Sequence, residues 1–141
     1  MIQYLEIKNS SNGINKINNS LKKNKCNIIA VYLQGCIHCK LLHPEWKKAA
    51  NKLKKSKRMG IVSFINMEYM NKLHINTSNV YGFPHIMAIK DGKQIIYNGP
   101  RDSLSLFNWM ISICPVSINK TKKNRRLNKK RKQTRRKKNL R

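Results

Sequence analysis

The sequence predicts an α/β domain in which helices cover both faces of a central mixed sheet of about five strands. Short apolar runs alternate with segments of helical spacing along the first part of the chain, which is the order of parallel strands joined by helices. The dipeptide Asp91-Gly92 then separates two strand-like runs and favours a tight hairpin, which adds antiparallel strands to the sheet. From Asn119 onward apolar residues almost disappear. We therefore expect one folded domain over residues 1–115 and a disordered basic tail over residues 116–141.

The elements are expected in the following order. Residues 3–7 alternate weakly and suit a short edge strand. Ile14, Ile17 and Leu21 share one face of a helix that ends near residue 23. The later elements are a buried strand over 27–33, a helix over 36–57, a strand over 61–67, a short helical piece over 68–73, strands over 85–89 and 94–97, and a last helix over 103–113 that Pro115 ends.

Two cysteines lie where the buried strand ends and the long helix begins, in Cys36-Ile37-His38-Cys39. Backbone N–H groups at a helix start point outward and the helix dipole favours negative charge, so a thiol there ionises more easily. Cys36 lies on the open side of this turn and suits a nucleophile. Cys39 lies one turn inside the helix and suits a resolving thiol.

The residues around the two thiols bear on their chemistry. His38 is expected to stabilise the Cys36 thiolate and so make the disulfide form more oxidising, the alternative being a solvated histidine without effect. Half of a zinc site is the competing interpretation of the two cysteines, with His38, His43 and His85 as further ligands. Because a structural zinc site needs four ligands and the chain has no second cysteine pair of this spacing, we expect no metal and no cofactor.

The stretch Cys36-Ile37-His38-Cys39-Lys40-Leu41-Leu42-His43-Pro44-Glu45-Trp46 resembles the active-site helix of the thioredoxin-like domains of protein disulfide isomerases. Val80-Tyr81-Gly82-Phe83-Pro84 resembles the cis-proline loop of the same family, and the resemblance covers about residues 20–113. It implies a thioredoxin fold and thiol–disulfide exchange on protein substrates. It also implies that Pro84 is cis, and that Gly35, Phe83 and Pro84 contact the substrate, Phe83 through its backbone N–H and C=O.

Three further positions are interpreted through the resemblance. Arg101 matches the family arginine that can approach and acidify the resolving thiol, and an exposed loop arginine without that role is the alternative. The family usually has a buried acid where this chain has Ala30, and a tryptophan where it has Gly35. Both departures put the turnover rate in doubt, and Lys40 or Arg101 is expected to substitute in part for the missing acid.

Two cysteines lie outside the motif. In the resembled topology, Cys26 at the start of the second strand and Cys114 at the end of the last helix both lie away from the dithiol. We expect them to be small buried hydrophobic residues, and a disulfide between them is the less favoured alternative because the chain is expected to be in a reducing compartment.

Positive charge is concentrated at the C-terminus. The chain has 31 Lys and Arg against 5 acidic residues, a formal net charge of +26. Fourteen of the 31 lie in residues 119–141, which contain no acid, so residues 1–118 carry +12. Nucleic acid bound through phosphates, an import receptor and an anionic membrane surface are the partners considered for the tail, and a solvated tail without a partner is the fourth possibility. The residues expected to contact a polyanion are Lys122, Lys123, Arg125, Arg126, Lys129, Lys130, Arg131, Lys132, Arg135, Arg136, Lys137 and Lys138.

These observations favour a monomeric thiol–disulfide oxidoreductase that acts on protein thiols and disulfides and is tethered by its tail to a polyanion, nucleic acid foremost. A basic nucleic-acid-binding or packaging protein, with the fold as a scaffold and little redox activity, is the alternative that Ala30 favours. The N-terminus lacks the basic and apolar regions of a secretory signal, and no apolar run has the length of a membrane span. We therefore expect a soluble protein on the cytoplasmic side or in the nucleus, or in the virion if the source is a virus.

Overall fold

The computed structural model describes residues 1–116. The candidate polyanion contacts from Lys122 to Lys138 therefore lie outside the described residues, and their role stays a prediction. The described elements are β1 (Ile2–Ile7), α1 (Ile14–Lys22), β2 (Asn27–Tyr32), α2 (Ile37–Lys55), β3 (Gly60–Asn66), the 3-10 helix η1 (Met67–Lys72), β4 (His85–Lys90), β5 (Lys93–Ile96) and α3 (Ser103–Ile113). This is the predicted order of strands and helices, and the thioredoxin fold is confirmed.

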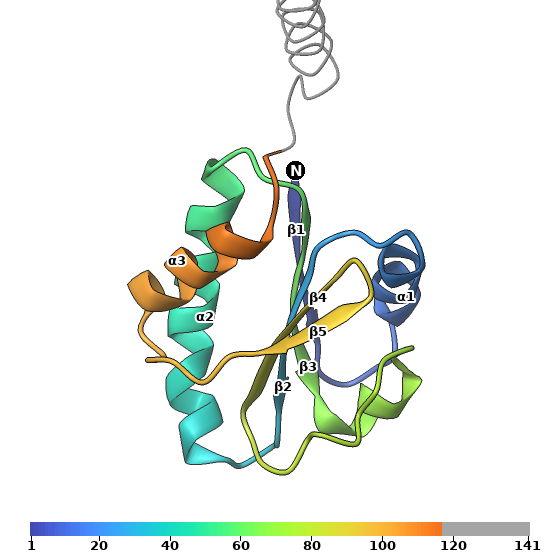
Figure 1. The fold of residues 1–141 in the computed structure, drawn as a ribbon. Helices are drawn as coiled ribbons and strands as arrows, with labels where there is room; N and C mark the ends of the chain where they lie inside the picture. Colours follow the sequence, from blue (N-terminus) through green and yellow to red (C-terminus); the bar gives the residue numbers. More distant parts are fainter. Residues whose placement is uncertain (117–141) are drawn as a thin grey trace, which may run out of the picture.

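The five strands form one mixed sheet in the order β1-β3-β2-β4-β5 (Figure 1). β1 and β2 both pair with β3 in parallel, whereas β4 is antiparallel to β2 and to β5. Asp91 and Gly92, between β4 and β5, have φ values of 53° and 74°. Positive φ at both central residues is what a type I′ hairpin requires, so the hairpin predicted from this dipeptide is confirmed.

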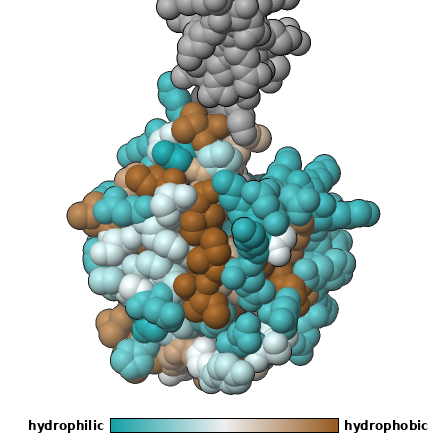
Figure 2. Space-filling model, in the orientation of Figure 1, coloured by the Kyte–Doolittle hydropathy of each residue, from teal (hydrophilic) through white to brown (hydrophobic). Residues whose placement is uncertain are grey.

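Helices cover both faces of the sheet (Figure 1). α2 and α3 lie on one face, over a core that includes Ala30 and Phe64 and in which Trp46 is fully buried. The indole N–H of Trp46 donates to the Ser63 carbonyl at 3.2 Å and so ties α2 to β3. The opposite face of the sheet carries α1, whose Ile17 is buried in a second hydrophobic cluster together with Ile29 of β2 and Ile65 of β3. The side of the molecule where α1 lies is largely hydrophilic, as Figure 2 shows.

One expectation about the fold is wrong. Cys26 and Cys114 form a disulfide, with 5.4 Å between their Cα atoms, although 88 positions separate them in the sequence. The two residues are therefore not free hydrophobic thiols. They are brought together because the start of β2 and the end of α3 meet beside β3. The contact with β3 is close, since a Cβ added to Gly60, its first residue, would lie 3.4 Å from Cys114 Sγ.

The C-terminal end of the described chain lies beside the same region. Val116, which the sequence analysis assigned to the tail, forms an isolated β-bridge with Arg58. The Arg58 guanidinium also donates to the carbonyls of Ile111 and Cys114, at 2.9 and 2.6 Å. None of the helices within residues 1–116 is both long and apolar enough to span a membrane.

Candidate active site

The two cysteines of the motif lie at the first turn of α2. Cys36 is the N-cap residue, and its Sγ accepts a hydrogen bond from the Cys39 backbone N–H at 3.3 Å. Gly35 precedes it with a φ of 82°, in the left-handed region that residues with a side chain rarely adopt. The turn therefore leaves Cys36 partly exposed, while Cys39, one helical turn further on, is only 3% exposed.

This arrangement separates the acidities of the two thiols. Hydrogen bonds from the Cys39 side chain and backbone N–H, and then from the His38 backbone N–H, lower the pKa of Cys36. Burial first, and then the hydrogen bond to Cys36, raise the pKa of Cys39 to about 11. Because the thiolate is the nucleophile, Cys36 is the thiol suited to attack an external disulfide.

The loop before β4 faces this thiol. The peptide bond between Phe83 and Pro84 is cis, and Pro84 is buried. The Phe83 carbonyl lies 3.8 Å from Cys36 Sγ. Among the described residues, neither the N–H nor the C=O of Phe83 has a backbone hydrogen-bond partner. An extended peptide chain can therefore pair with this residue next to the sulfur.

The other residues singled out from the sequence lie around this centre at greater distance. The side chains of His38 and Arg101 are exposed. His38 contributes through its backbone N–H, and the positive charge of Arg101 weakly lowers the pKa of both thiols. Ala30 is fully buried in β2 and brings no titratable group beneath the dithiol.

Sequence reasoning missed one feature of the site. A pocket of about 430 Å³ opens beside the dithiol, and its wall includes both cysteines, Lys40 and His43. His43 is bound in turn to Glu6 of β1. Cys39 and His43 are four residues apart on a helix, so the sequence could have predicted that they lie on the same side of it. The pairing with Glu6, 37 positions away, had no signal in the sequence.

Known proteins match this chain through the same part of it. The family model "Thioredoxin" matches residues 9–112. Among curated proteins, the probable protein disulfide-isomerase A4 of Caenorhabditis elegans is 31% identical over 94 residues, which is 64% of this chain and 14% of that protein. Protein disulfide-isomerase A4 of Mus musculus is 33% identical over 91 residues, 62% of this chain and 14% of that protein. The chain thus spans about a seventh of the length of these relatives.

Solved structures agree on the fold. The solution structure of the first thioredoxin domain of mouse protein disulfide-isomerase A4 has a TM-score of 0.57 and 23% identity, and covers 76% of this chain and 72% of that domain. Crystal form II of ERdj5 has a TM-score of 0.60 and 21% identity, and covers 79% of this chain and 15% of that one. With the family model spanning most of the described residues, the chain belongs to the thioredoxin family, and it is similar to a thioredoxin domain of protein disulfide-isomerase A4.

Proposed function

We propose that the protein is a thiol–disulfide oxidoreductase that acts on protein disulfides through Cys36 and Cys39. The observation that carries the proposal is the unequal pair of thiols at the start of α2. One is partly exposed with a lowered pKa, the other is buried with a pKa raised to about 11, and the first faces the backbone of Phe83. A pair of structural thiols would not need this difference.

The reaction proceeds in two exchanges. The Cys36 thiolate attacks one sulfur of a substrate disulfide, forms a mixed disulfide and releases the other substrate sulfur as a thiolate. Cys39, as a thiolate, then attacks Cys36 Sγ and releases the remaining substrate sulfur, which leaves the Cys36–Cys39 disulfide. The substrate gains two electrons and the dithiol loses two. The same steps in reverse oxidise a dithiol substrate.

A polypeptide substrate fits the surroundings of Cys36. The backbone N–H and C=O of Phe83, which have no backbone partner in the described residues, can hydrogen-bond an extended chain, which gives binding without sequence selectivity. Three apolar residues near Cys36 in the chain are also exposed, Leu33 by 41%, Ile37 by 62% and Leu41 by 64%. Exposed apolar surface around a reactive thiol suits the apolar segments that an unfolded or misfolded protein presents.

The test measures exchange on proteins. Full-length protein is expected to catalyse reduction of insulin by dithiothreitol and to reactivate scrambled ribonuclease, and Cys36→Ser should do neither. Cys114→Ser serves as the control, because it removes one sulfur of the distant disulfide and leaves the dithiol intact. A wild-type protein without either activity would overturn the proposal and favour the packaging alternative.

We propose in addition that the segment from residue 119 to residue 141 tethers the domain to nucleic acid. The support is its composition, 14 Lys and Arg without an acid. The segment contains no aromatic residue, so phosphate contacts and not base stacking would supply the affinity. If about 6 to 8 of these side chains neutralise phosphates, log affinity should fall against log salt with a slope of roughly −5 to −7.

Filter binding to unrelated duplexes over a salt series tests the tether. Removing residues 119–141 should abolish most of the binding and leave exchange on small disulfides unchanged. A truncated protein that binds as tightly as the full chain would move the binding surface to the domain. If neither form binds, vesicles with anionic lipid or an import receptor become the partners to test.

A further inference from the structure

The second exchange needs a base. Cys39 must lose its proton before it can attack the mixed disulfide, yet it is 3% exposed and burial raises its pKa to about 11. Near neutral pH a thiol buried in this way is almost entirely protonated. Cys36 cannot take the proton at this stage, because its sulfur is bonded to the substrate. Ala30, on the face of β2 that packs in the same core as Cys39, offers no acceptor.

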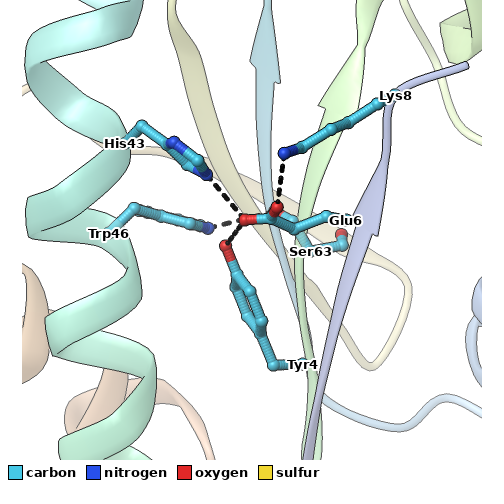
Figure 3. Close-up of polar contacts among 6 residues, drawn as sticks. All are labelled: Tyr4, Glu6, Lys8, His43, Trp46 and Ser63. Atoms are coloured by element: carbon cyan, nitrogen blue, oxygen red, sulfur yellow. Dashed lines mark hydrogen bonds and ion pairs between the residues drawn. The ribbon is translucent and has the colours of Figure 1, made fainter.

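An acid lies on the same face of the sheet two strands away. In the register of the sheet, Phe64 of β3 is opposite Ala30 of β2 on one side and opposite Glu6 of β1 on the other. The Glu6 carboxylate accepts from the Tyr4 hydroxyl at 2.8 Å and pairs with Lys8 Nζ at 3.1 Å, as Figure 3 shows. Burial alone would raise the pKa of Glu6, but hydrogen bonds from His43, Tyr4 and Lys8 outweigh it and hold the pKa at about 2. Glu6 is therefore ionised at any physiological pH.

His43 connects this carboxylate to α2 (Figure 3). Its Nε2 lies 2.6 Å from Glu6 Oε2. The imidazole ring stacks on Phe64, with centroids 4.7 Å apart and planes 19° apart, and Phe64 stacks in turn on Tyr32. An ionised carboxylate can only accept, so Nε2 carries the hydrogen, and the lone pair of the neutral ring is on Nδ1. Nδ1 has no hydrogen-bond partner among the described residues.

The pocket beside the dithiol joins His43 to Cys39. Both residues line it, one helical turn apart on α2, and its volume of about 430 Å³ has room for water. The charged and titratable groups around the pair are Tyr4 on β1, Lys8 just after it, Tyr32 on β2, Arg101 before α3, and Cys36, Cys39 and Lys40 at the start of α2. The positive charge of Arg101 weakly lowers the pKa of Cys39. Glu6 is the acid that contacts His43.

We propose that His43, held and polarised by Glu6, takes the proton of the Cys39 thiol through a water molecule in this pocket when Cys39 resolves the mixed disulfide. The proton moves from Cys39 Sγ to the water, and a proton of that water moves to His43 Nδ1. Cys39 Sγ then bonds to Cys36 Sγ, the bond from Cys36 to the substrate sulfur breaks, and the substrate leaves as a thiolate. In the reverse direction His43 returns the proton. This inference rests on the proposed function and adds the group that moves the proton; Glu6 is a positioning residue.

The test separates the two exchanges. Reduced full-length protein is mixed with glutathione disulfide, quenched with acid at successive times and analysed by mass spectrometry, which distinguishes the Cys36–glutathione mixed disulfide from the internal disulfide. The series covers roughly pH 5 to pH 9, the range in which a histidine base titrates. In the wild type, the rate of resolution should rise through a histidine-like inflection.

Three variants and one control follow from the contacts. His43→Phe keeps the ring stack and removes both nitrogens, so resolution near neutral pH should slow about 10- to 100-fold, with the inflection lost and the first exchange unchanged. Glu6→Gln replaces the carboxylate that holds His43 Nε2 with a neutral amide, so resolution should slow, but less than in His43→Phe. Free imidazole should restore resolution in His43→Ala. His74→Phe is the matched control, since His74 is an exposed histidine outside the pocket.

The outcomes separate the two proposals. If His43→Phe and Glu6→Gln resolve at the wild-type rate with the wild-type pH profile, the proton transfer through His43 is wrong while the dithiol chemistry stands. If His43→Phe does not fold, as judged by circular dichroism, Glu6→Gln and the imidazole series decide alone, and no response in either overturns the inference. A wild type that forms no mixed disulfide with glutathione overturns the proposed function and this inference together.

Discussion

The four cysteines form two pairs with opposite surroundings at opposite ends of the sheet. Cys36 and Cys39 are three positions apart in the chain, are unbonded and lie at the start of α2. Cys26 and Cys114 are 88 positions apart, are bonded, and are 3% and 1% exposed. The difference is not in the thiols but in what each backbone presents to them, an open helix start in one case and a closed core in the other.

The comparison shows how one domain can keep the Cys26–Cys114 disulfide intact while the Cys36–Cys39 pair exchanges with substrates. Attack on a disulfide requires a line of approach to one of its sulfurs. Cys36 offers that approach, since it is partly exposed next to the backbone of Phe83. Cys26 and Cys114 offer none in the folded domain. Reductants should therefore distinguish the two pairs by access.

The largest expected effect is on exchange itself. Cys36→Ser should lower the rate of insulin reduction at least about 1,000-fold, since no other exposed thiol can attack the substrate. The double variant Cys26→Ala and Cys114→Ala should keep the rate within a factor of about two at a temperature where it is folded. A comparable loss in both would mean that the second pair also takes part in exchange.

The next effect is on stability and concerns the other pair. A disulfide that closes a loop of 88 residues lowers the entropy of the unfolded chain. Removing it as the double alanine variant should cost about 2 to 5 kcal/mol of the free energy of unfolding. Urea denaturation followed by circular dichroism measures this, with Cys36→Ser as the control that should cost far less. Equal midpoints for wild type and double variant would show that this pair is not bonded in solution.

A smaller effect separates the two thiols of the reactive pair. With the pKa of Cys36 lowered and that of Cys39 raised to about 11, iodoacetamide near pH 6 should modify Cys36 at least about 100-fold faster. Each rate should rise with pH as the thiolate fraction grows, and Cys36 should level off first. Peptide mapping after a pulse of reagent gives both rates. Equal labelling would remove the distinction between nucleophile and resolving thiol.

The smallest effect is on redox potential. If the side chain of His38 stabilises the Cys36 thiolate, the potential should lie on the order of −180 to −230 mV, and His38→Pro should lower it by about 30 mV or more, a tenfold change in the equilibrium. Equilibration with glutathione buffers measures both. A wild-type value near about −270 mV would identify a reductant and remove the isomerase-like interpretation of His38.

The site could be predicted from the sequence where its parts are close together in the chain. Cys36, His38 and Cys39 are consecutive or nearly so, and the strand before them and the helix after them follow from hydrophobic periodicity alone. The local signal of Asp91-Gly92 was equally sufficient, because the φ values that a type I′ hairpin needs are a property of those two residues. Pro44 within α2 does not end the helix, which runs to Lys55.

Sequence alone thus determined the order of the elements, the reactive pair and the concentration of charge at the C-terminus. Only the tertiary structure decided that Cys26 bonds to Cys114 and that Glu6 reaches His43. The physical reason is common to both. Periodicity and turn chemistry are written in neighbouring residues, whereas these contacts depend on which strands lie side by side and in what register. β1 enters the sheet beside β3, and that pairing brings the carboxylate of Glu6 within 2.6 Å of a histidine on α2.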